Sequence, residues 1–277
     1  MRQARRDLIA AATKRLATAG VRDPGRDARL LMRWISGLDG AGLTAAENDP
    51  MQDAEAAAFD CAVAARAARQ PLSQIVGWRS FWGRDFIVTP DVLDPRPETE
   101  SLIAEALRRP ARRVLDLGTG SGCILVTLLA EWREASGLGV DICDKALAVA
   151  ARNAHLFDVA GRCEWRSGDW CLGLTGRFDL ILSNPPYVPA HQMAGLEPEV
   201  IDHEPKIALS PGGDGLAAYR SMAPYLSALL LPHGRVIVEI GVGQAESVQA
   251  ILAAAGLDIC ELIPDLSGRV RAVVARA

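Results

Sequence analysis

The chain has 277 residues, 49% of them hydrophobic, which is enough for one large domain or for one domain with a smaller one beside it. Its net charge of −4 and pI of about 5.7 argue against a protein that binds bare nucleic acid, because phosphate binding needs a basic surface. No apolar run reaches the roughly 18 residues of a membrane span. We therefore expect no membrane association and no direct nucleic-acid binding.

The cysteine pattern predicts neither a disulfide framework nor a metal site. The six cysteines lie at positions 61, 123, 143, 163, 171 and 260. No pair has C-x-x-C spacing, and no histidine stands near enough in sequence to suggest a zinc site. Scattered cysteines of this kind are typical of reduced thiols, so we expect a cytoplasmic protein without a metal ion.

Residues 1–70 have the spacing of a small helical bundle. Apolar residues recur at helical intervals up to Gly20, a second helix fits residues 27–35, and an Ala-rich third fits residues 51–69. The Arg-rich start also resembles an organellar transit peptide, but an acidic residue interrupts the basic run and no cleavable spacer follows. We expect this domain to act as a cap or to recognise a partner, and the resemblance described below favours substrate docking.

Residues 71–95 change character and predict a linker built around a β-hairpin. Aromatic and β-branched residues surround Gly83. Beyond the linker, Pro97 suits the first turn of a helix, and Glu98 and Glu100 suit its positive end.

Residues 96–277 alternate between strands and helices. The strand candidates are 113–117, 137–142, 178–183, 235–240 and 270–275, with a weaker pattern at 163–166. Helical stretches such as 144–156 and 243–255 fall between most of them. Such alternation predicts an α/β fold whose parallel sheet is covered on both faces. Because ligands bind beyond the carboxyl ends of such strands, we expect the chemistry in the loops that follow them.

A glycine loop follows the first strand candidate of this sheet. It reads Gly118-Thr119-Gly120-Ser121-Gly122, and its glycines permit a sharp turn and a close approach to a ligand. Cys123 replaces the last glycine of a dinucleotide fingerprint. Asp116, at the strand end, would place a carboxylate where a pyrophosphate ought to sit. The loop is therefore poor for NAD but suits a cationic methionine ammonium group.

A second carboxylate strengthens the prediction of an adenosine cofactor. Asp141 ends the next strand candidate about twenty residues further on, where it can accept hydrogen bonds from two ribose hydroxyls. The alternative role of Asp141 is to cap the following helix, and Asp144 fits that role better.

The strand candidate 178–183 leads into Asn184-Pro185-Pro186-Tyr187. The prolines fix the backbone and remove two N–H donors, which leaves the Asn184 side-chain oxygen and the Pro185 carbonyl as an edge of acceptors. Two acceptors match the hydrogens of a planar –NH₂ group, and Tyr187 can stack on its flat face. A proline-rich strand exit is the alternative, yet a turn needs neither the second proline nor the aromatic residue.

This motif predicts methyl transfer to a planar nitrogen. An amide nitrogen is a poor nucleophile because its lone pair is delocalised into the carbonyl. Two directed hydrogen bonds can hold the group and aim that lone pair at a sulfonium methyl, while carbonyl dipoles stabilise the developing charge. From the residues alone, the acceptor is a glutamine or asparagine amide or an exocyclic base amine.

The chain resembles the release-factor glutamine N5-methyltransferase family along nearly its whole length. The motifs that carry the resemblance are GWRSFWGRDFIVTPDVLDPRPETE (77–100), VLDLGTGSG (114–122), GDW (168–170), NPPY (184–187), GGDGL (212–216), EIGVGQ (239–244) and DLSGRVR (265–271). The resemblance implies a class-I methyltransferase domain, Rossmann-like with a seven-stranded and mostly parallel sheet. It implies S-adenosylmethionine as cofactor and class-I peptide-chain release factors as partners, with the glutamine of their Gly-Gly-Gln loop as substrate.

The resemblance also implies roles for individual residues. Residues 118–122 and Asp141 would hold the cofactor, and Trp170 would pack beside its adenine. Asn184 would border cofactor and substrate, and the motif 184–187 would grip the glutamine. Glu98 and Thr99 would line the methionine end of the cofactor. Two residues depart from the family pattern, since Gln74 stands where a tyrosine is usual and Asp94 where an apolar residue is usual.

Other activities stay open at this point. A glutamine methyltransferase of a ribosomal protein would use the same chemistry. An adenine-N6 nucleic-acid methyltransferase shares the Asn-Pro-Pro-Tyr motif but needs a cationic surface for base flipping. An inactive interaction protein on the same fold is disfavoured by the intact Asn184 and loop glycines. Outside these motifs, residues 212–215 predict a turn, and Glu239 and Arg269 could form a structural ion pair.

Overall fold

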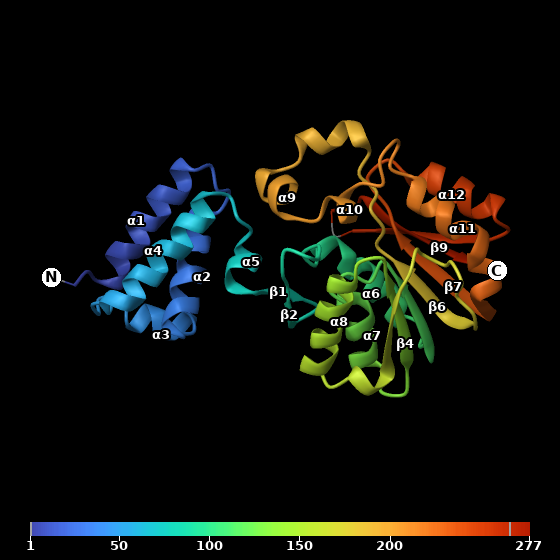
Figure 1. Ribbon diagram of the computed structural model, residues 1–277, viewed down its shortest axis with the longest axis horizontal. Coiled ribbons are helices and arrows are strands. Elements are labelled where there is room, and N and C mark those ends of the chain that lie inside the picture. The colour runs from blue at the N-terminus through green and yellow to red at the C-terminus, as the bar shows by residue number, and fades with distance from the viewer. Residues whose placement is uncertain (1, 266) are drawn as a thin grey trace. The chain divides into compact units, whose positions relative to one another are not determined.

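The computed structural model describes residues 2–265 and 267–277, which divide into two compact units (Figure 1). The first unit comprises Met1–Gly77 together with Glu197–His203, and the second comprises Trp78–Leu196 together with Glu204–Ala277. The sequence pattern gives no sign that residues 197–203 fold with the N-terminal helices. The boundaries at 70/71 and 95/96 stay a prediction.

The first unit is helical, as the apolar spacing predicts. Its helices are α1 (Arg5–Thr18), α2 (Pro24–Ser36), α3 (Gly40–Ala45), α4 (Asp53–Ala67), α5 (Leu72–Val76) and α9 (Pro198–His203). Residues spaced three or four apart point inward, for example Ala28, Leu31 and Met32 of α2, which are fully buried. Pro24 starts α2, and Gly37 ends it in the left-handed conformation with φ of +65°.

The predicted β-hairpin is present and belongs to the second unit. Strands β1 (Trp78–Phe81) and β2 (Arg84–Ile87) pair antiparallel. Trp82 and Gly83 form the two-residue turn, both with positive φ, which matches the twist of a tight hairpin. Phe81 and Phe86 are buried, and they pack in the core of this unit. The chain then enters η1 (Pro97–Thr99) and α6 (Glu100–Leu107).

A seven-stranded sheet forms the centre of the second unit, which confirms the predicted fold class. Its strands are β3 (Arg113–Leu117), β4 (Ser136–Asp141), β5 (Cys163–Ser167), β6 (Phe178–Ser183), β7 (Leu230–Glu239), β8 (Asp258–Pro264) and β9 (Val270–Arg276). They lie in the order β5-β4-β3-β6-β7-β9-β8. All pairs are parallel except those of β9, which runs antiparallel to both neighbours.

Helices cover both faces of this sheet (Figure 1). Alternate side chains of each strand serve opposite faces, so Leu180 and Leu182 pack on one side and Ile181 packs on the other. The first face carries α6, α7 (Cys123–Glu131) and α8 (Asp144–Leu156), and the second carries α11 (Ala217–Leu229) and α12 (Ala245–Ala254). The short elements are η2 (Ala160–Arg162), η3 (Ala190–Gly195) and α10 (Lys206–Leu209).

The strand order of the sheet predicts where a ligand binds. The sheet order reverses at β3, because β4 lies on one side of it and β6 on the other, and ligands bind at such points in α/β sheets.

Across the described residues, no helix combines the length and apolar character that crossing a membrane requires.

Candidate active site

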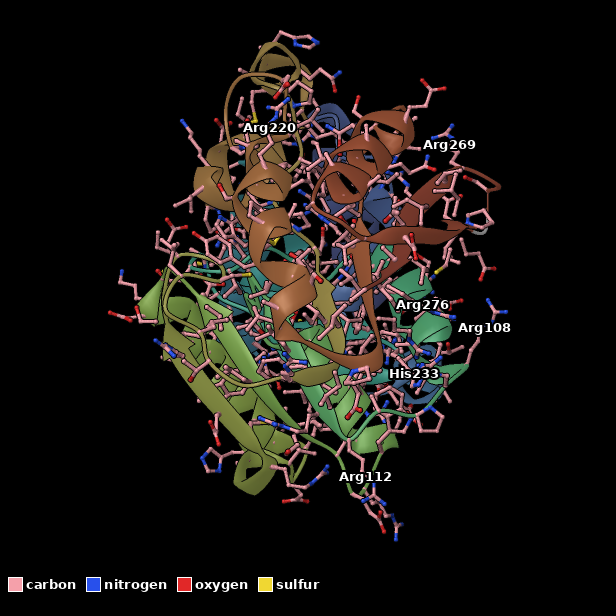
Figure 2. The ribbon with its side chains drawn as sticks, turned by 90° about the vertical axis from the view of Figure 1, so that its right-hand side faces the viewer. Arg108, Arg112, Arg220, His233, Arg269 and Arg276 are labelled. Atoms are coloured by element: carbon pink, nitrogen blue, oxygen red, sulfur yellow. The ribbon has the colours of Figure 1, made fainter. Side chains whose placement is uncertain are left out.

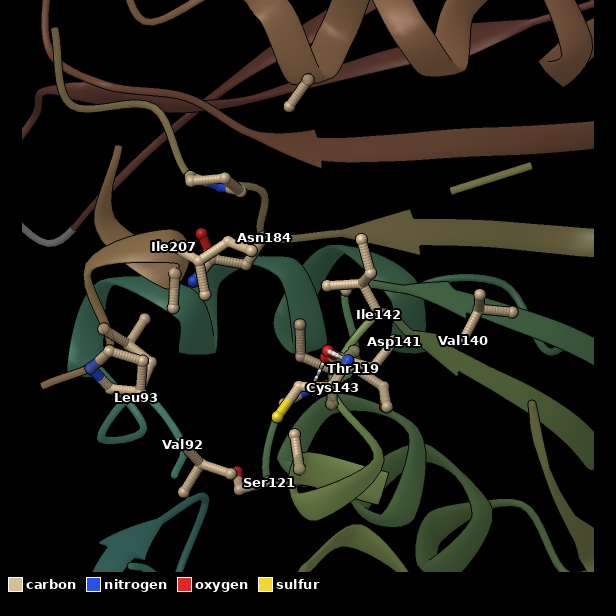
Figure 3. Close-up of a pocket in the computed structure, with 18 of the residues that line it drawn as sticks. Val92, Leu93, Thr119, Ser121, Val140, Asp141, Ile142, Cys143, Asn184 and Ile207 are labelled. Carbon is tan, nitrogen blue, oxygen red and sulfur yellow. Dashed lines mark hydrogen bonds between the residues drawn. The ribbon is translucent and has the colours of Figure 1, made fainter. Parts of the chain in front are cut away.

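A cavity of about 330 Å³ lies beyond the carboxyl ends of β3, β4 and β6, within the second unit (Figure 3). Its walls come from the loops that follow these strands and from the segments 91–96 and 205–211. The lining includes the predicted site residues Thr99, Gly118, Thr119, Gly120, Ser121, Asp141, Trp170, Asn184 and Pro186. Figure 3 shows Asn184 and Ile207 on one side of the cavity and Asp141 and Ile142 on the other. A cavity of this size suits a small cofactor or ligand.

The glycine loop lies against the cavity in a conformation that its glycines make possible. Gly118, Gly120 and Gly122 all have positive φ, at 69°, 55° and 77°. A Cβ on Gly118 would lie only 3.2 Å from the Trp170 ring, so the missing side chain lets the ring close over the loop. Gly122 directly precedes α7, whose first N–H groups have no partner within the helix.

Asp141 joins the loops that follow β3 and β4. Its Oδ2 accepts a hydrogen bond from the Gly120 N–H at 2.9 Å, and its Oδ1 accepts one from the Cys143 N–H at 2.9 Å. The expectation that Asp144 caps the next helix is wrong, because Cys143 is the N-cap and Asp144 is the first helical residue. Asp141 is half-buried and faces the cavity, so its remaining lone pairs can serve a ligand.

Asp116 is closed off from solvent beneath the glycine loop. Its side chain is completely buried, and its Oδ2 accepts a hydrogen bond from the Thr119 hydroxyl at 2.6 Å. Burial raises the pKa of this carboxyl to about 7. The carboxylate therefore acts on the cavity through Thr119, which lines it, and direct contact between Asp116 and a methionine ammonium stays a prediction.

The Asn-Pro-Pro-Tyr segment follows β6 and is held from several sides. The Ser183 hydroxyl donates to the Leu117 carbonyl at 2.7 Å, which fixes the end of β6 against β3. Asn184 is half-buried, and its Nδ2 donates to the Thr99 hydroxyl at 3.0 Å. Pro186 lines the cavity beside Asn184. The amide of Asn184 is thus anchored through its nitrogen, and its Oδ1 is left as an acceptor.

Tyr187 is anchored at both its ring and its backbone. Its hydroxyl donates to Glu239 Oε1 at 3.2 Å, and its carbonyl accepts a hydrogen bond from Gln244 Nε2 at 2.9 Å. Burial, reinforced by the charge of Glu239, raises the pKa of the Tyr187 phenol, so it stays neutral. Stacking of Tyr187 on the substrate amide stays a prediction.

Glu239, at the end of β7, is a site residue that the sequence reasoning missed. Its carboxylate is completely buried and accepts hydrogen bonds from Thr99 at 2.6 Å and from Tyr187 at 3.2 Å. The suggested ion pair with Arg269 is wrong, because the described partners of the Glu239 carboxylate are these two hydroxyls. The available signal was an acidic residue closing an apolar strand, which is costly unless the charge has partners.

The turn at 212–215 also supports the Asn-Pro-Pro-Tyr segment. The predicted turn is present, and Gly215 has φ of +82°. A Cβ at this position would lie 2.3 Å from the Tyr187 carbonyl oxygen and 3.1 Å from the Pro189 nitrogen. Any other residue would therefore push the segment away, which explains the need for glycine here.

Comparison with known proteins identifies the family. Residues 7–77 match the family described as PrmC N-terminal domain, and residues 94–237 match the family described as Methyltransferase small domain. A release factor glutamine methyltransferase of Cereibacter sphaeroides is 54% identical over 98% of this chain and 97% of its own. The chain belongs to the release factor glutamine methyltransferase family. A family member from Rhodospirillum rubrum is 45% identical over 95% of this chain and 82% of its own.

Solved structures agree with the fold of this family member. A methyltransferase from Pyrococcus furiosus has a TM-score of 0.54 at 16% identity and covers 71% of this chain and 90% of its own. The hMettl16 catalytic domain, solved with an RNA hairpin, has a TM-score of 0.56 at 15% identity and covers 81% of this chain and 82% of its own. At such identities the likeness shows the class-I methyltransferase fold alone.

The protein is a methyltransferase that uses S-adenosylmethionine, and the charges of the cavity suit this cofactor. The lining contains four acidic residues, Asp91, Asp94, Asp141 and Asp169, and one basic residue, Arg96. Arg96 is paired with Glu204, at 2.7 and 2.8 Å, and Asp91 with Lys145, at 3.3 Å. A surplus of carboxylates favours a ligand with sulfonium and ammonium groups and disfavours a pyrophosphate. Trp170 and the exposed Ile142 add apolar surface for an adenine ring.

Proposed function

We propose that the protein methylates the side-chain amide nitrogen, N5, of the glutamine in the Gly-Gly-Gln loop of class-I peptide-chain release factors. The observation that carries the proposal is the anchoring of Asn184, which lines the cavity and is held through Nδ2, so that Oδ1 remains as an acceptor for a substrate –NH₂ group. The relatives named release factor glutamine methyltransferase support the choice of substrate, since this chain matches them over almost its whole length.

The cofactor is assigned to the loops at the carboxyl ends of β3 to β5. Asp141, which lines the cavity, would accept hydrogen bonds from the ribose hydroxyls, and the backbone of residues 118–122 together with Thr99 would hold the methionine end. Trp170, which also lines the cavity, would pack beside the adenine. When bound, S-adenosylmethionine supplies an electrophilic methyl group on a positively charged sulfur.

The protein's contribution to the chemistry is to hold one –NH₂ group in a fixed plane. Asn184 Oδ1 and the Pro185 carbonyl accept its two hydrogens, which orients the nitrogen lone pair. The same two dipoles stabilise the positive charge that develops on the nitrogen. Tyr187, held neutral by its buried position, presents a ring to the amide and adds no charge beside the cofactor.

The arginines of the second unit give no support to a nucleic-acid substrate. Figure 2 labels six basic side chains on one face, with Arg220 and Arg269 in the upper part of the view and Arg276, Arg108, His233 and Arg112 lower down. Arg108 is paired with Glu105 and Glu261, Arg112 with Glu134, and Arg220 with Asp214. A phosphate backbone needs a continuous and unpaired basic surface. A protein acceptor is the better fit.

The deciding experiment follows methyl transfer to intact release factor by mass spectrometry. Wild-type enzyme should add one methyl group to the loop glutamine, and none to a Gln→Glu release factor, to duplex DNA or to the corresponding ribosomal protein. Asn184→Ala should lower kcat by about 10²- to 10³-fold, as expected for losing a directed interaction made with developing charge. Transfer to DNA but not to release factor, or undiminished transfer to the Gln→Glu substrate, would refute the assignment.

A further inference from the structure

We propose that Glu239, acting through Thr99, is a positioning residue that fixes which end of the Asn184 amide faces the substrate. The inference rests on the proposed function, because it concerns the acceptor oxygen that receives the glutamine –NH₂ group. It assigns a role in turnover to a buried carboxylate and a hydroxyl that lie behind the catalytic segment.

The Thr99 hydroxyl has a single proton to donate. Thr99 Oγ1 lies 2.6 Å from Glu239 Oε2, and an ionised carboxylate can only accept. The Thr99 proton is therefore committed to Glu239. Only lone pairs of Oγ1 remain for Asn184, so the atom of Asn184 that lies 3.0 Å away must be the donor, Nδ2.

The orientation of Asn184 follows from this. With Nδ2 bound to Thr99, Oδ1 is the end of the amide left to receive a hydrogen from the substrate. A reversed amide would present its own N–H groups to the substrate –NH₂, and two donors cannot hydrogen-bond to each other. Donation thus runs from Asn184 Nδ2 to Thr99 and from Thr99 to Glu239, which leaves Asn184 Oδ1 as the acceptor that methyl transfer requires.

The surroundings make this chain of hydrogen bonds rigid. Glu239 is completely buried and Thr99 is 1% exposed, so solvent does not compete for their hydrogen bonds. The other carboxylate oxygen accepts from Tyr187, and the Glu239 carbonyl accepts from the Tyr219 hydroxyl at 2.7 Å. A neutral amide at position 239 has one acceptor oxygen, so it can accept from Thr99 only when its N–H groups turn toward the Tyr187 hydroxyl. The carboxylate accepts from both hydroxyls at once, so its charge commits the Thr99 proton in a way that the volume of the side chain alone does not.

Three variants test the proposal in the full-length enzyme with intact release factor. Thr99→Val keeps the shape of the side chain and removes the hydroxyl, and we expect kcat to fall about 10- to 100-fold. Glu239→Gln keeps the size and should lower kcat to a similar extent. Thr99→Ser restores the hydroxyl and should recover most of the lost kcat. For Glu239→Gln, the Kd of the demethylated cofactor, measured by calorimetry, should change far less than kcat.

Thr127→Val is the matched control. Thr127 lies on α7, is completely buried, and its hydroxyl has no hydrogen-bond partner among the described residues. Thr127→Val therefore removes a buried hydroxyl from the same unit and leaves the hydrogen bonds of Glu239, Thr99 and Asn184 unchanged. The double variant Thr99→Val/Glu239→Gln adds a second control. Because both residues act in the same series of hydrogen bonds, the double variant should lose no more kcat than Thr99→Val loses alone.

The outcomes separate this inference from the function on which it rests. A wild-type enzyme that leaves release factor unmethylated would remove the proposed function and this inference with it. An active wild type would leave the function standing, and Thr99→Val or Glu239→Gln at full kcat would then overturn the role of Glu239. Equal losses in Thr127→Val and Thr99→Val would overturn it too, because the effect would then come from packing alone.

Discussion

At the scale of single residues, the site depends on the direction of hydrogen bonds more than on their number. Asn184 is symmetric in shape but not in chemistry, since one end of its amide donates and the other accepts. Thr99 can present either a proton or a lone pair. Glu239, as an anion, can only accept, so its charge sets the direction of the hydrogen bonds among all three residues. Replacing the Glu239 carboxylate by a neutral group of similar size should therefore lower kcat, although Glu239 does not line the cavity.

The pH dependence of kcat should carry the signature of Glu239. Burial raises the pKa of this carboxyl to about 7, against hydrogen bonds from Thr99 and Tyr187 that lower it. Only the ionised form accepts from both hydroxyls. We therefore expect kcat to rise as the pH increases through about 7 and to level off above it. Fixed-time assays with saturating substrates, over roughly two pH units on either side of that pKa, measure the profile.

Glu239→Gln is the control that assigns this pH dependence. Other ionisable or charged groups act on Glu239 or share its surroundings, namely Glu98, Arg271, Cys123, Tyr187 and Tyr219. Two further buried carboxyls of the second unit, Asp116 and Glu204, also have a pKa raised to about 7 by burial. Only the part of the profile that disappears in Glu239→Gln belongs to Glu239. An unchanged inflection in that variant would contradict the prediction.

At the scale of elements, one asparagine of α8 connects the hairpin to the cofactor loop. Asn153 is completely buried, exchanges two hydrogen bonds with the backbone of Ile87 at 2.8 and 3.0 Å, and donates to the Ser121 carbonyl at 2.8 Å. β2, α8 and the loop after β3 thus share one side chain. The position of the glycine loop depends on this connection as well as on Asp141.

Asn153→Leu should therefore destabilise the second unit and weaken cofactor binding together. The change leaves buried backbone groups of Ile87 and Ser121 without partners, at a cost of roughly 3 kcal/mol in the free energy of unfolding. Urea unfolding and calorimetric titration of the cofactor measure the two effects. Arg152→Leu, on the exposed side of the same helix, should change stability by only about 0.5 kcal/mol. Equal effects of the two variants would show that Asn153 has no special role.

The elements also show which parts of the fold the sequence could predict. Strands β3 and β6 and helix α8 were predicted within a residue or two, because continuous apolar runs or helical periodicity mark buried elements. β8 was missed because it lies at the sheet edge, where most of its side chains are exposed, and its apolar residues do not alternate regularly with polar ones. Thr99, Asn184 and Glu239 come together from distant parts of the chain. The sequence around each of them fits several roles, and only the tertiary structure shows the hydrogen bonds that link the three residues.

At the scale of the whole molecule, the chain passes between its two units at residues 77/78, 196/197 and 203/204. It leaves the second unit after Leu196, shortly beyond the Asn-Pro-Pro-Tyr segment, contributes Glu197–His203 to the helical unit, and returns at Glu204. Within the helical unit, Glu199 of α9 accepts hydrogen bonds from Arg66 at 2.9 Å and from Arg69 at 2.8 Å. Arg66 also donates to Asp27 at 2.8 Å, so α2, α4 and α9 share one buried group of charges.

This group of charges should control the stability of the helical unit without affecting the cofactor site. Glu199→Ala leaves Arg69 without its carboxylate, while Arg66 keeps Asp27, and losing such a half-buried charged partner costs about 1–3 kcal/mol. Calorimetric unfolding should therefore show a lower Tm for the helical unit, while cofactor binding to the second unit stays intact. Glu197→Ala is the matched control, because its contact with Arg22 is 4.0 Å long and both side chains are largely exposed.

The pH dependence of this stability gives an independent test with a fixed sign. Burial alone would raise the pKa of Glu199, but the hydrogen bonds from Arg69 and Arg66 outweigh burial and lower it below the ordinary value of 4.5. A lowered pKa means that the stabilisation is complete above about 4.5 and is lost as the pH falls through the value in the folded state. Wild type and Glu199→Ala should therefore differ most near neutral pH and converge in acid. A difference in Tm that persists unchanged into acid would mean that packing, and not the charge of Glu199, holds α9 in the helical unit.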